Sequence, residues 1–506
     1  MRRWVLIFVL IIDIFLFGIL QADEDRLSAE RFAQWNLNYA SYLIDVGKYL
    51  EALDAYNTAY EVTTYRRTKF RTLLYKANLL ATFLDAEEEA LKIYDQIIKK
   101  YPEGEEIALY RKGLLLFDME KWQDAIKVLS TYLQKYPQGR FSFQAEVLLE
   151  KAKKAVPPSP PPPTKRPKVR VLLYRKVNRV IISGKNLTIN GHPLGQKYLI
   201  CYYKQGVVCA NYPSALSYTI TASTPLEITA KKRKKKVRGS ILLLAKERSL
   251  MVINIVDIEK YLWGVVPSES YPSWPLETLK AQAVASRTYA FYQILHRKNW
   301  DYDLVDNEGD QAYKGVERET PRTTRAVQET EGLVLVEKNR PILAMYTANS
   351  GGYTADAGCI FQLYKSYLIA HPDPFSLKGK MAYWEKTFSK KEIENSLRRI
   401  GLNIKGLQDI IPVEKGPSGR IVKVKIIARQ GTGIYRTRTI LRRALKLPEI
   451  LFFIKKKCNF FIFEGRGWGH GVGYSQWGAA ELGKKGYTFK QILQFYYPST
   501  ELKKMW

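Results

Sequence analysis

The chain has 506 residues, of which 46% are hydrophobic and 13% are aromatic. This composition excludes a mostly disordered protein, and the length is sufficient for two or three domains with buried cores. The formal net charge of +31 favours a polyanionic partner, namely nucleic acid, an acidic membrane surface or an anionic cell-wall polymer. Charge alone does not choose among these three.

Residues 1–22 have the features of an export signal. Two arginines precede the apolar run WVLIFVLIIDIFLFGIL, and LQA forms a loose cleavage site at its end. Asp13 interrupts the run and would cost about 3 kcal/mol at the centre of a bilayer, which favours a cleaved signal over a permanent inner-membrane anchor. Both alternatives place the rest of the chain in the periplasm or cell envelope, so nucleic acid is not expected as a partner.

The four cysteines include no CxxC pair and no Cys/His cluster, so the sequence predicts neither a metal site nor a bound cofactor. Cys201 and Cys209 flank CYYKQGVVC, which resembles a short hairpin. A disulfide between them and two free thiols are equally open alternatives.

Residues 23–155 are predicted to be entirely helical. The segments EALDAY, EALKIY and DAIKVL place alanines at 52, 90 and 125, which are 38 and 35 residues apart. This period resembles a tetratricopeptide-type array, in which small residues stand where paired helices approach closely. The expected role is binding of a protein partner, and a plain helical spacer is the alternative. Residues 156–168, VPPSPPPPTKRPK, form a proline-rich and semi-rigid linker.

Strand-like segments begin after this linker, namely KVRVLLY, KYLICYY, LSYTITA, RGSILLLA and LMVINIV. The fold-class prediction is therefore multidomain, with an all-α repeat domain followed by a mixed α/β domain over residues 169–506. A run of basic residues over 231–238 interrupts the strands. A solvated loop is the favoured interpretation, and contact with an acidic polymer or lipid headgroups is the alternative.

The segment after these strands carries the first candidate for chemistry. A strand-like run ends at Val266, a loop covers residues 267–274, and a helix is predicted to begin near Pro275. Glu269 lies in this loop among aromatic residues, which would raise its pKa and suit a general acid, whereas a nearby helix N-terminus would favour the carboxylate. Arg287 lies on the core-facing stripe of the helix and therefore needs a partner.

Two further segments have polar or glycine-rich patterns. Asp306, Glu308 and Asp310 lack the spacing of a calcium loop and are predicted to lie in a solvated loop. EGRGWGHGVGYSQWGA, Glu464–Ala479, does not match GxGxxG. Its glycines are predicted to allow positive φ angles and close backbone approach between a strand and a short helix, and His470 is expected to make a structural hydrogen bond.

GVVPSESYPSWPLETLKAQAVASRTYA resembles the signature of the stage II sporulation protein D family, which also contains the amidase enhancers. Further segments fit the family's pattern in the expected order: VRGSILLL with SLMVINIVDIEKYL, then DNEGDQAYKGV, AMYTANSGGYTAD and GHGVGYSQWGA. The resemblance covers about residues 169–506 and leaves the helical array outside it.

The resemblance implies a lytic transglycosylase of peptidoglycan. Such enzymes cut the bond between N-acetylmuramic acid and N-acetylglucosamine and leave a 1,6-anhydro end, on strands stripped of stem peptides by a partner N-acetylmuramoyl-L-alanine amidase. The family's catalytic glutamate falls on Glu269. The motif arginine falls on Arg287, which is expected to hold a sugar carboxylate, with Glu269 as the alternative partner. The other candidate substrate contacts are Gln311, Tyr313, Ser350 and Gln476, and for Tyr313 and Ser350 a core position and a tight turn are equally open. His470 is also a candidate, although a structural hydrogen bond is favoured for it.

The family also allows two alternatives to this enzyme. One is an amidase enhancer that binds the wall without cleaving it, and the other is a scaffold whose array recruits division or sporulation proteins. Some relatives carry a metal site before the Gln-x-Tyr element, but RKNWDYDLVDNEGD here contains neither His nor Cys. The prediction is therefore a metal-independent enzyme of cell-wall remodelling in division or sporulation.

Overall fold

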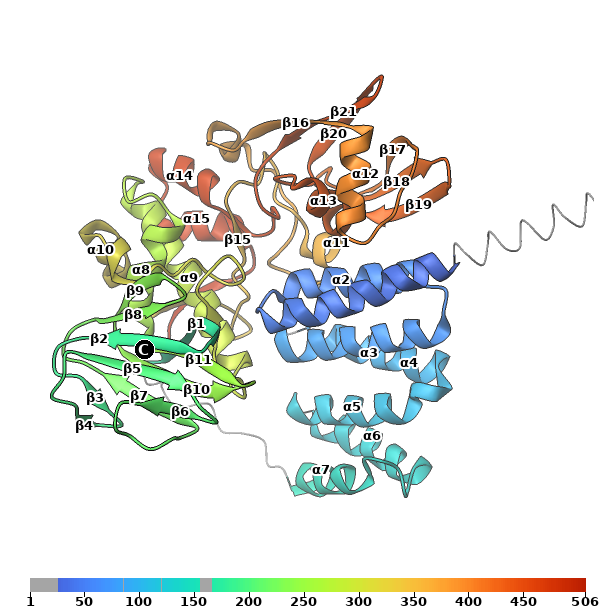
Figure 1. Cartoon of the computed structure of the whole chain (residues 1–506). Coiled ribbons are helices and arrows are strands. Elements are labelled where there is room, and N and C mark those ends of the chain that lie inside the picture. The colour runs from blue at the N-terminus through green and yellow to red at the C-terminus, as the bar shows by residue number, and fades with distance from the viewer. Residues whose placement is uncertain (1–25, 85, 120, 155–165) are drawn as a thin grey trace, which may run out of the picture. The chain divides into compact units, whose positions relative to one another are not determined.

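A computed structural model describes residues 26–84, 86–119, 121–154 and 166–506 (Figure 1). The predicted export signal and most of the predicted linker lie outside the described residues. None of the described helices is long and apolar enough to cross a membrane. Contacts divide the chain into two compact units. The first unit joins the N-terminal helices with Phe388–Ile411 and Lys423–Lys446, and the second holds the remaining residues from 166 onward.

The N-terminal residues form the predicted helical array. Residues 26–45 are helical, and each later helix packs on the next one along the chain. The alanines at 52, 90 and 125 are fully buried, because only a small side chain fits where two helices approach closely. The all-α part of the fold-class prediction is confirmed. The helices are α2 (Tyr49–Val62), α3 (Arg66–Phe83), α4 (Glu87–Lys100), α5 (Glu105–Asp118), α6 (Trp122–Lys135) and α7 (Ser142–Lys154).

The first unit also contains a segment from the far end of the chain, which the sequence did not predict. Arg438 forms an ion pair with Asp54 of α2, and Arg436 lies 3.3 Å from Glu61. The guanidinium of Arg443 stands 3.6 Å from the centre of the Tyr39 ring. The elements of this segment are α12 (Lys390–Arg399), β19 (Gly431–Arg436), η4 (Thr437–Arg442) and α13 (Arg443–Leu445), with parts of β17 (Leu407–Lys415) and β18 (Ile421–Ala428).

The second unit is built around two sheets, which are antiparallel except for the parallel pair of β1 and β12. The strand orders are β12-β1-β11-β10-β7-β3-β4 and β6-β5-β2-β8-β9. In the larger sheet β11 pairs with β1 and β10, with Ile253 opposite both Leu172 and Leu242. The strands are β1 (Lys168–Val177), β2 (Arg179–Ser183), β3 (Thr188–Ile189), β4 (His192–Pro193), β5 (Tyr198–Tyr203), β6 (Val207–Cys209), β7 (Ser217–Thr221), β8 (Leu226–Ala230), β9 (Arg233–Val237), β10 (Ser240–Lys246), β11 (Ser249–Asp257) and β12 (Leu304–Val305).

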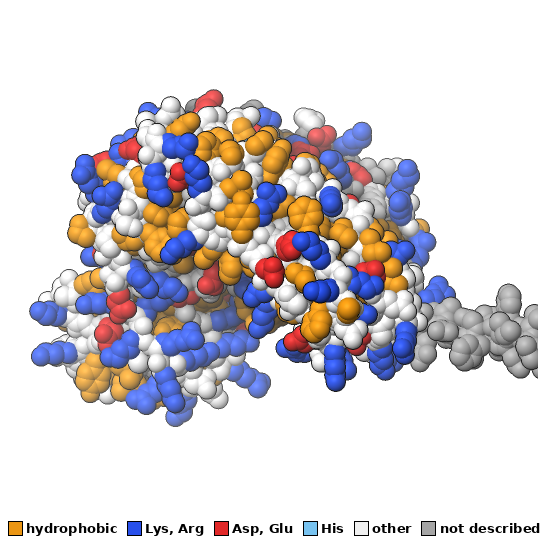
Figure 2. All heavy atoms as spheres, turned by 90° about the horizontal axis from the view of Figure 1, so that it is seen from above, with side chains coloured by type: hydrophobic (Ala, Val, Ile, Leu, Met, Phe, Trp, Pro, Cys, Tyr) orange, Lys and Arg blue, Asp and Glu red, His pale blue; other side chains and the backbone are white. Residues whose placement is uncertain are grey.

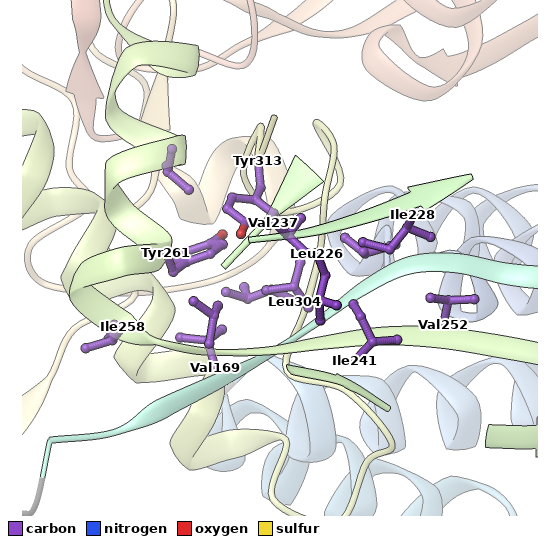
Figure 3. Packing of buried hydrophobic residues seen from close by; sticks show 14 of the residues in the cluster. Val169, Leu226, Ile228, Val237, Ile241, Val252, Ile258, Tyr261, Leu304 and Tyr313 are labelled. Atoms are coloured by element: carbon purple, nitrogen blue, oxygen red, sulfur yellow. The ribbon is translucent and has the colours of Figure 1, made fainter. Parts of the chain in front are cut away.

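Alternating apolar residues of these strands make one buried core with the two helices that follow (Figure 3). Ile241 on β10 and Ile228 on β8 are fully buried, while their sequence neighbours are partly exposed, as expected for strands with one covered face. Tyr261, from the first of these two helices, joins the same core. Cys201 and Cys209 form a disulfide that joins β5 to β6, which closes the alternative left open by the sequence.

The basic run lies in strand β9 at the edge of the smaller sheet rather than in a loop. Lys235 forms an ion pair with Asp306, and Arg238 lies 2.7 Å from Glu319. Lys234 also pairs with Glu227, so three of the cations bind carboxylates inside the second unit. The interpretation as a loop is therefore wrong, whereas solvation holds for residues 231–234 and 236, which are exposed. On the face seen in Figure 2, Lys and Arg side chains are spread over the surface rather than gathered in one patch.

Two helices cover the core and position the candidate site. The expected strand before residue 267 is wrong, since α8 spans Ile258–Glu269. The expected loop is confirmed over 270–274 only, because its first three residues, Glu269 among them, belong to the helix. The Asp257 carboxylate caps this helix by accepting from the backbone N–H groups of Glu259 and Lys260. The helix expected near Pro275 is confirmed as α9 (Leu276–His296). Packing of α8 on α9 outweighs the low helix propensity of VVP in α8.

Smaller elements complete the second unit, and with them the mixed α/β prediction is confirmed. Three small sheets have the strand orders β14-β13-β23, β15-β22 and β16-β21-β20. Their strands are β13 (Leu333–Glu337), β14 (Arg340–Pro341), β15 (Tyr346–Thr347), β16 (Tyr383–Ser389), β20 (Phe452–Lys457), β21 (Phe460–Arg466), β22 (Tyr474–Ser475) and β23 (Glu501–Lys504). The short helices are η2 (Gly315–Arg318), α10 (Pro321–Glu329), α11 (Ala357–Phe361), η3 (Pro374–Lys378), α14 (Gln476–Lys484) and α15 (Phe489–Tyr496).

Candidate active site

Glu269 is the last residue of α8, and its side chain is half-buried. The backbone N–H of Ser270 closes the helix by donating to the Val266 carbonyl. A carboxylate at this end faces the negative pole of the helix dipole, which disfavours the charged form. The C-terminal end of α8 therefore raises the pKa of Glu269, whereas the helix N-terminus expected from the sequence would lower it.

Both carboxyl oxygens of Glu269 accept hydrogen bonds from neutral groups. The backbone N–H of Ala312 lies 2.7 Å from Oε1, and Nε2 of Gln476 lies 3.1 Å from Oε2. Burial raises the pKa of Glu269, the hydrogen bonds from Ala312 and Gln476 and the nearby Tyr346 hydroxyl lower it by less, and the charge of Glu308 adds a further rise. No described cation forms an ion pair with Glu269, so the net shift favours the protonated acid.

Gln311 and Tyr313 are buried, and together they hold the backbone between them against Glu269. Gln311 accepts a 3.1 Å hydrogen bond from the Tyr261 hydroxyl and donates to the Ser286 carbonyl at 3.2 Å. The Tyr313 hydroxyl donates to Oδ1 of Asn254 at 3.0 Å. Because both flanking side chains are fixed, the N–H of Ala312 points at Glu269. The Gln-x-Tyr element thus supports the carboxyl group through its backbone rather than lining a groove as expected.

Gln476, the first residue of α14, lies next to Glu269 as a member of a buried amide network. Its Nε2 also lies 3.4 Å from Oε1 of Gln282, and Gln282 donates to the Ser286 hydroxyl at 3.0 Å. Ser270 donates to the same Gln282 oxygen at 3.3 Å. Sequence reasoning missed Gln282, although a glutamine on the buried stripe of α9, four residues before Ser286, was a signal that could have revealed it.

Tyr346 of β15 is the second residue that sequence reasoning missed. Burial raises its pKa well above the usual range, and its hydroxyl lies near Glu269 without a hydrogen-bond partner among the described residues. The phenol therefore stays a neutral donor beside the carboxyl group. Tyr346 lies within AMYTANSGG, a segment that resembles the family. Nothing in the residues of that segment indicated a chemical role for the tyrosine.

The glycine-rich segment brings Gln476 into place, and its predicted conformation is confirmed. It runs from β21 to α14, and Gly467, Gly469, Gly471 and Gly473 all have positive φ. Gly473 has a φ of 71°, and a Cβ atom there would stand 2.2 Å from the backbone oxygen of Met345, the residue before β15. Only glycine permits this approach, which allows β22 to pair with β15 next to Glu269.

Ser350 and His470 do not reach Glu269 by any described hydrogen bond. Ser350 is fully buried, and its hydroxyl donates to the Asp373 carboxylate at 2.6 Å. Its backbone N–H donates to the hydroxyl of Ser475, so it supports the residue that precedes Gln476. His470 accepts a 3.0 Å hydrogen bond from the Val472 N–H at Nδ1, as expected of a structural histidine. Burial leaves the Ser350 hydroxyl no exposed surface in this structure.

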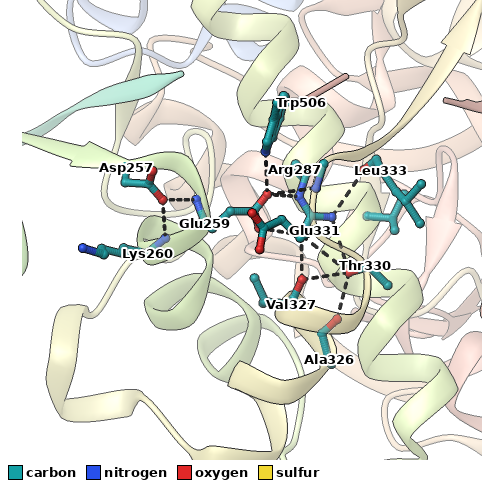
Figure 4. A network of polar contacts seen from close by, with 12 residues as sticks. Asp257, Glu259, Lys260, Arg287, Ala326, Val327, Thr330, Glu331, Leu333 and Trp506 are labelled. Carbon is teal, nitrogen blue, oxygen red and sulfur yellow. Dashed lines mark hydrogen bonds and ion pairs between the residues drawn. The ribbon is translucent and has the colours of Figure 1, made fainter. Parts of the chain in front are cut away.

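Arg287, the other residue expected to bind a sugar, lies buried in a polar network (Figure 4). Its side chain is 0% exposed and binds Glu259 through two nitrogens, at 2.9 and 2.7 Å. The remaining donors face the carbonyl oxygens of Val327 and Leu333. Glu259 in turn accepts from the indole N–H of Trp506 at 3.1 Å. Arg287 therefore ties α9 to α8 and to the C-terminus, and its charge is neutralised away from substrate.

The acidic cluster differs from the solvated loop predicted for it. Asp310 has a fully buried side chain that pairs with Arg297 at 2.9 Å and accepts from the Tyr289 hydroxyl at 2.8 Å. Asp306 pairs with Lys235, and only Glu308 of the three is exposed. Within the described residues, no group of three or more His, Cys, Asp or Glu side chains could hold a metal ion.

Aromatic side chains form a surface directly after Glu269. The rings of Tyr271, Trp274 and Trp477 contact one another with centres 5.1 to 5.7 Å apart. Tyr271 is 50% exposed, whereas Trp274 is buried beneath it. Because Trp477 follows Gln476, the two sides of the site each contribute a ring.

These features define a class of protein, namely a helical repeat array joined to an α/β module. In that module a glutamate accepts hydrogen bonds from neutral donors and lies next to a cluster of aromatic rings. Comparison with known families agrees with both parts. A family model described as Stage II sporulation protein matches residues 246–336, and Tetratricopeptide repeat matches 71–104 and 107–139. A domain of unknown function matches residues 366–473.

The chain belongs to the stage II sporulation protein D family. It is 33% identical over 265 residues to an uncharacterised protein of Brachyspira hyodysenteriae, covering 52% of this chain and 71% of that protein. It is 29% identical to the stage II sporulation protein D of Bacillus subtilis, covering 56% of this chain and 86% of the relative. Identity to the amidase enhancer of Bacillus subtilis is 28%, covering 48% of this chain and 40% of that longer protein.

Proposed function

We propose that the protein is a peptidoglycan lytic transglycosylase that uses Glu269 first as general acid and then as general base. The observation that carries the proposal is the environment of Glu269, whose pKa is raised and whose two oxygens accept only from neutral donors. A raised pKa keeps a larger fraction of the carboxyl group protonated near neutral pH, which glycosidic-bond protonation requires.

The first step breaks the bond between the anomeric carbon of N-acetylmuramic acid and the bridging oxygen. Glu269 donates its proton to that oxygen, which leaves with the bonding electron pair on N-acetylglucosamine. The muramyl ring then carries oxocarbenium-like charge, which the new carboxylate stabilises. Ala312 and Gln476 strengthen their hydrogen bonds to Glu269 as it becomes negative, since a charged acceptor binds donors more tightly.

The second step closes the 1,6-anhydro ring. The substrate's own C6 hydroxyl attacks the anomeric carbon, and Glu269 takes the hydroxyl proton, which restores the acid. Because the nucleophile belongs to the substrate, no second carboxylate is needed to place a water molecule. Burial of the Arg287 charge against Glu259 supports this cycle, since a free guanidinium beside Glu269 would lower its pKa and weaken it as an acid.

The biological setting of the proposal is cell-wall remodelling in the envelope during sporulation or division. Relatives named stage II sporulation protein D and amidase enhancer support a wall-related role. An N-acetylmuramoyl-L-alanine amidase would supply stripped strands, and the helical array would bind a protein partner. Export directed by residues 1–22 belongs to the same proposal, with cleavage favoured over a retained inner-membrane anchor. Fractionation of cells that produce the full chain distinguishes the two outcomes.

The test is incubation of the purified chain with peptide-stripped glycan strands, followed by mass spectrometry of the products. Anhydromuramyl ends are expected from the wild type and not from Glu269→Gln. Glu317→Gln is the matched control, because it removes an exposed carboxylate of the same unit and leaves the Ala312 and Gln476 contacts intact. Equal product from wild type and Glu269→Gln would exclude Glu269 as the acid. Strand binding without product from any variant would instead favour the wall-binding amidase enhancer.

A further inference from the structure

A cavity of about 600 Å³ lies among residues that make no contact with Glu269. Its lining comes from the sheet of β16, β20 and β21 and from residues 415, 418 and 419. All of it belongs to the second unit, within the stretch matched by the domain of unknown function. The lining includes Tyr383, Trp384, Lys415, Phe452, Phe453 and Arg466.

Aromatic rings form the wall of this cavity. The rings of Trp384 and Phe452 meet edge to face with centres 6.0 Å apart. Trp384 rests on the backbone of Gly465, where a Cβ atom would stand 2.1 Å from the indole. Tyr383 and Phe453 are exposed by 67% and 65% at the mouth. Flat apolar walls of this kind suit the C–H faces of sugar rings.

Two cations of the lining have no ion-pair partner in the part of the chain that the structure describes, namely Arg466 and Lys415. The carboxylate of Glu464 is already bound by Lys455 at 2.6 Å, and Glu385 is exposed. A guanidinium with free donors beside an apolar wall matches a planar carboxylate, which it can bind through two parallel hydrogen bonds. The lining therefore suits a ligand with both a ring face and a carboxylate.

One segment connects this cavity to the candidate active site. Arg466 ends β21, and the backbone of the next two residues bonds Ala382 at 3.0 Å and Asn349 at 2.8 Å. Ten residues after Arg466 the same segment supplies Gln476, which donates to Glu269. A polymer that lies along this segment can contact both ends of it.

We propose that the cavity binds a carboxylate-bearing sugar of the glycan strand that Glu269 cuts, with the ring on Trp384 and the carboxylate on Arg466. This inference rests on the proposed function and adds a recognition site for the free lactyl carboxylate of peptide-stripped strands. A stem peptide removes that carboxylate by forming an amide. The cavity therefore selects stripped strands over peptide-bearing ones.

The experiment measures affinity by fluorescence anisotropy, with labelled peptide-stripped strands and with the same strands after conversion of their carboxylates to neutral amides. The full chain carrying Glu269→Gln is the parent, so that strands are not cut. Adding Arg466→Gln is expected to weaken binding of the stripped strands about tenfold and to leave binding of the amidated strands unchanged. Trp384→Leu should weaken binding of both probes. Arg340→Gln, at an exposed arginine of β14, is the control and should change neither.

Equal affinity of parent and Arg466→Gln for the stripped strands overturns the proposal, as does equal affinity of the parent for both probes. Thermal unfolding of each variant separates lost binding from lost folding, and Arg466→Lys provides a second variant that keeps the charge without the paired donors. Failure of the proposed function is recognised by a different result, namely the absence of anhydro product from the wild type. That result does not affect the comparison of affinities, since the parent does not cut the strands.

Discussion

Replacement of Arg287 by methionine separates a structural arginine from a substrate-binding one. The side chain of Arg287 is 0% exposed and that of Glu259 is 3% exposed, so removal of the arginine leaves a buried carboxylate without its counter-charge. The hydrogen bonds to Glu259 from the Gly332 N–H and the Trp506 indole remain and do not neutralise it. The expected effect is therefore on stability, with catalysis lost only through unfolding.

The magnitude follows from the isolation of this pair. Loss of one partner of a buried ion pair costs about 3 to 5 kcal/mol. A domain has about 5 to 15 kcal/mol of unfolding free energy in total. In a large domain each kcal/mol of lost unfolding free energy lowers Tm by about 2 to 4 °C. Arg287→Met should therefore lower Tm by roughly 6 to 20 °C. The double variant Arg287→Met with Glu259→Met should recover part of this loss, because no charge is then left buried.

Calorimetry of the wild type, the two variants and the exposed control Arg340→Gln measures these shifts. Product formation is measured in parallel, well below each Tm. The reasoning is refuted if Arg287→Met keeps the wild-type Tm and yet forms no product, since that outcome assigns the arginine to the substrate.

Three further predictions concern residues around Glu269. Glu308→Gln removes a negative charge that raises the pKa of Glu269. The alkaline limb of the pH–rate profile, where the acid loses its proton, should therefore move to lower pH, and an unmoved limb contradicts this. Glu269→Gln should raise Tm at neutral pH and lose that advantage in acid, because a raised pKa makes ionisation costly for the folded state; a lower neutral Tm contradicts this. Gly473→Ala should lower Tm and product together, because a Cβ would meet a backbone oxygen at 2.2 Å, and a silent variant would refute that packing.

Local patterns predicted the elements whose structure depends on neighbouring residues. The alanine period gave the array, because close helix packing needs a small residue at regular intervals. The glycines between β21 and α14 predicted positive φ angles, which depend only on the missing Cβ atom. Glu269 came from the family signature, and its raised pKa from burial agrees with the aromatic residues around it.

Long-range partners were beyond local patterns. The Arg287–Glu259 pair depends on α8 being a helix, and the apolar run ending in VVP indicated a strand. The capping signal of Asp257 before Glu259 pointed the other way and carried the more reliable information. The pairing of Arg438 with Asp54 joins residues from opposite ends of the chain, and no periodicity encodes it.

The origin of the oxygen at the new glycan end tests the central claim most directly. Peptide-stripped strands are incubated with the wild-type chain in water enriched in oxygen-18, and the ends are analysed by mass spectrometry. If Glu269 passes its proton between the leaving oxygen and the substrate's own hydroxyl, the products are anhydromuramyl ends without the label. Labelled reducing ends that depend on Glu269 would contradict the account, because they would show that water and not the C6 hydroxyl completes the reaction.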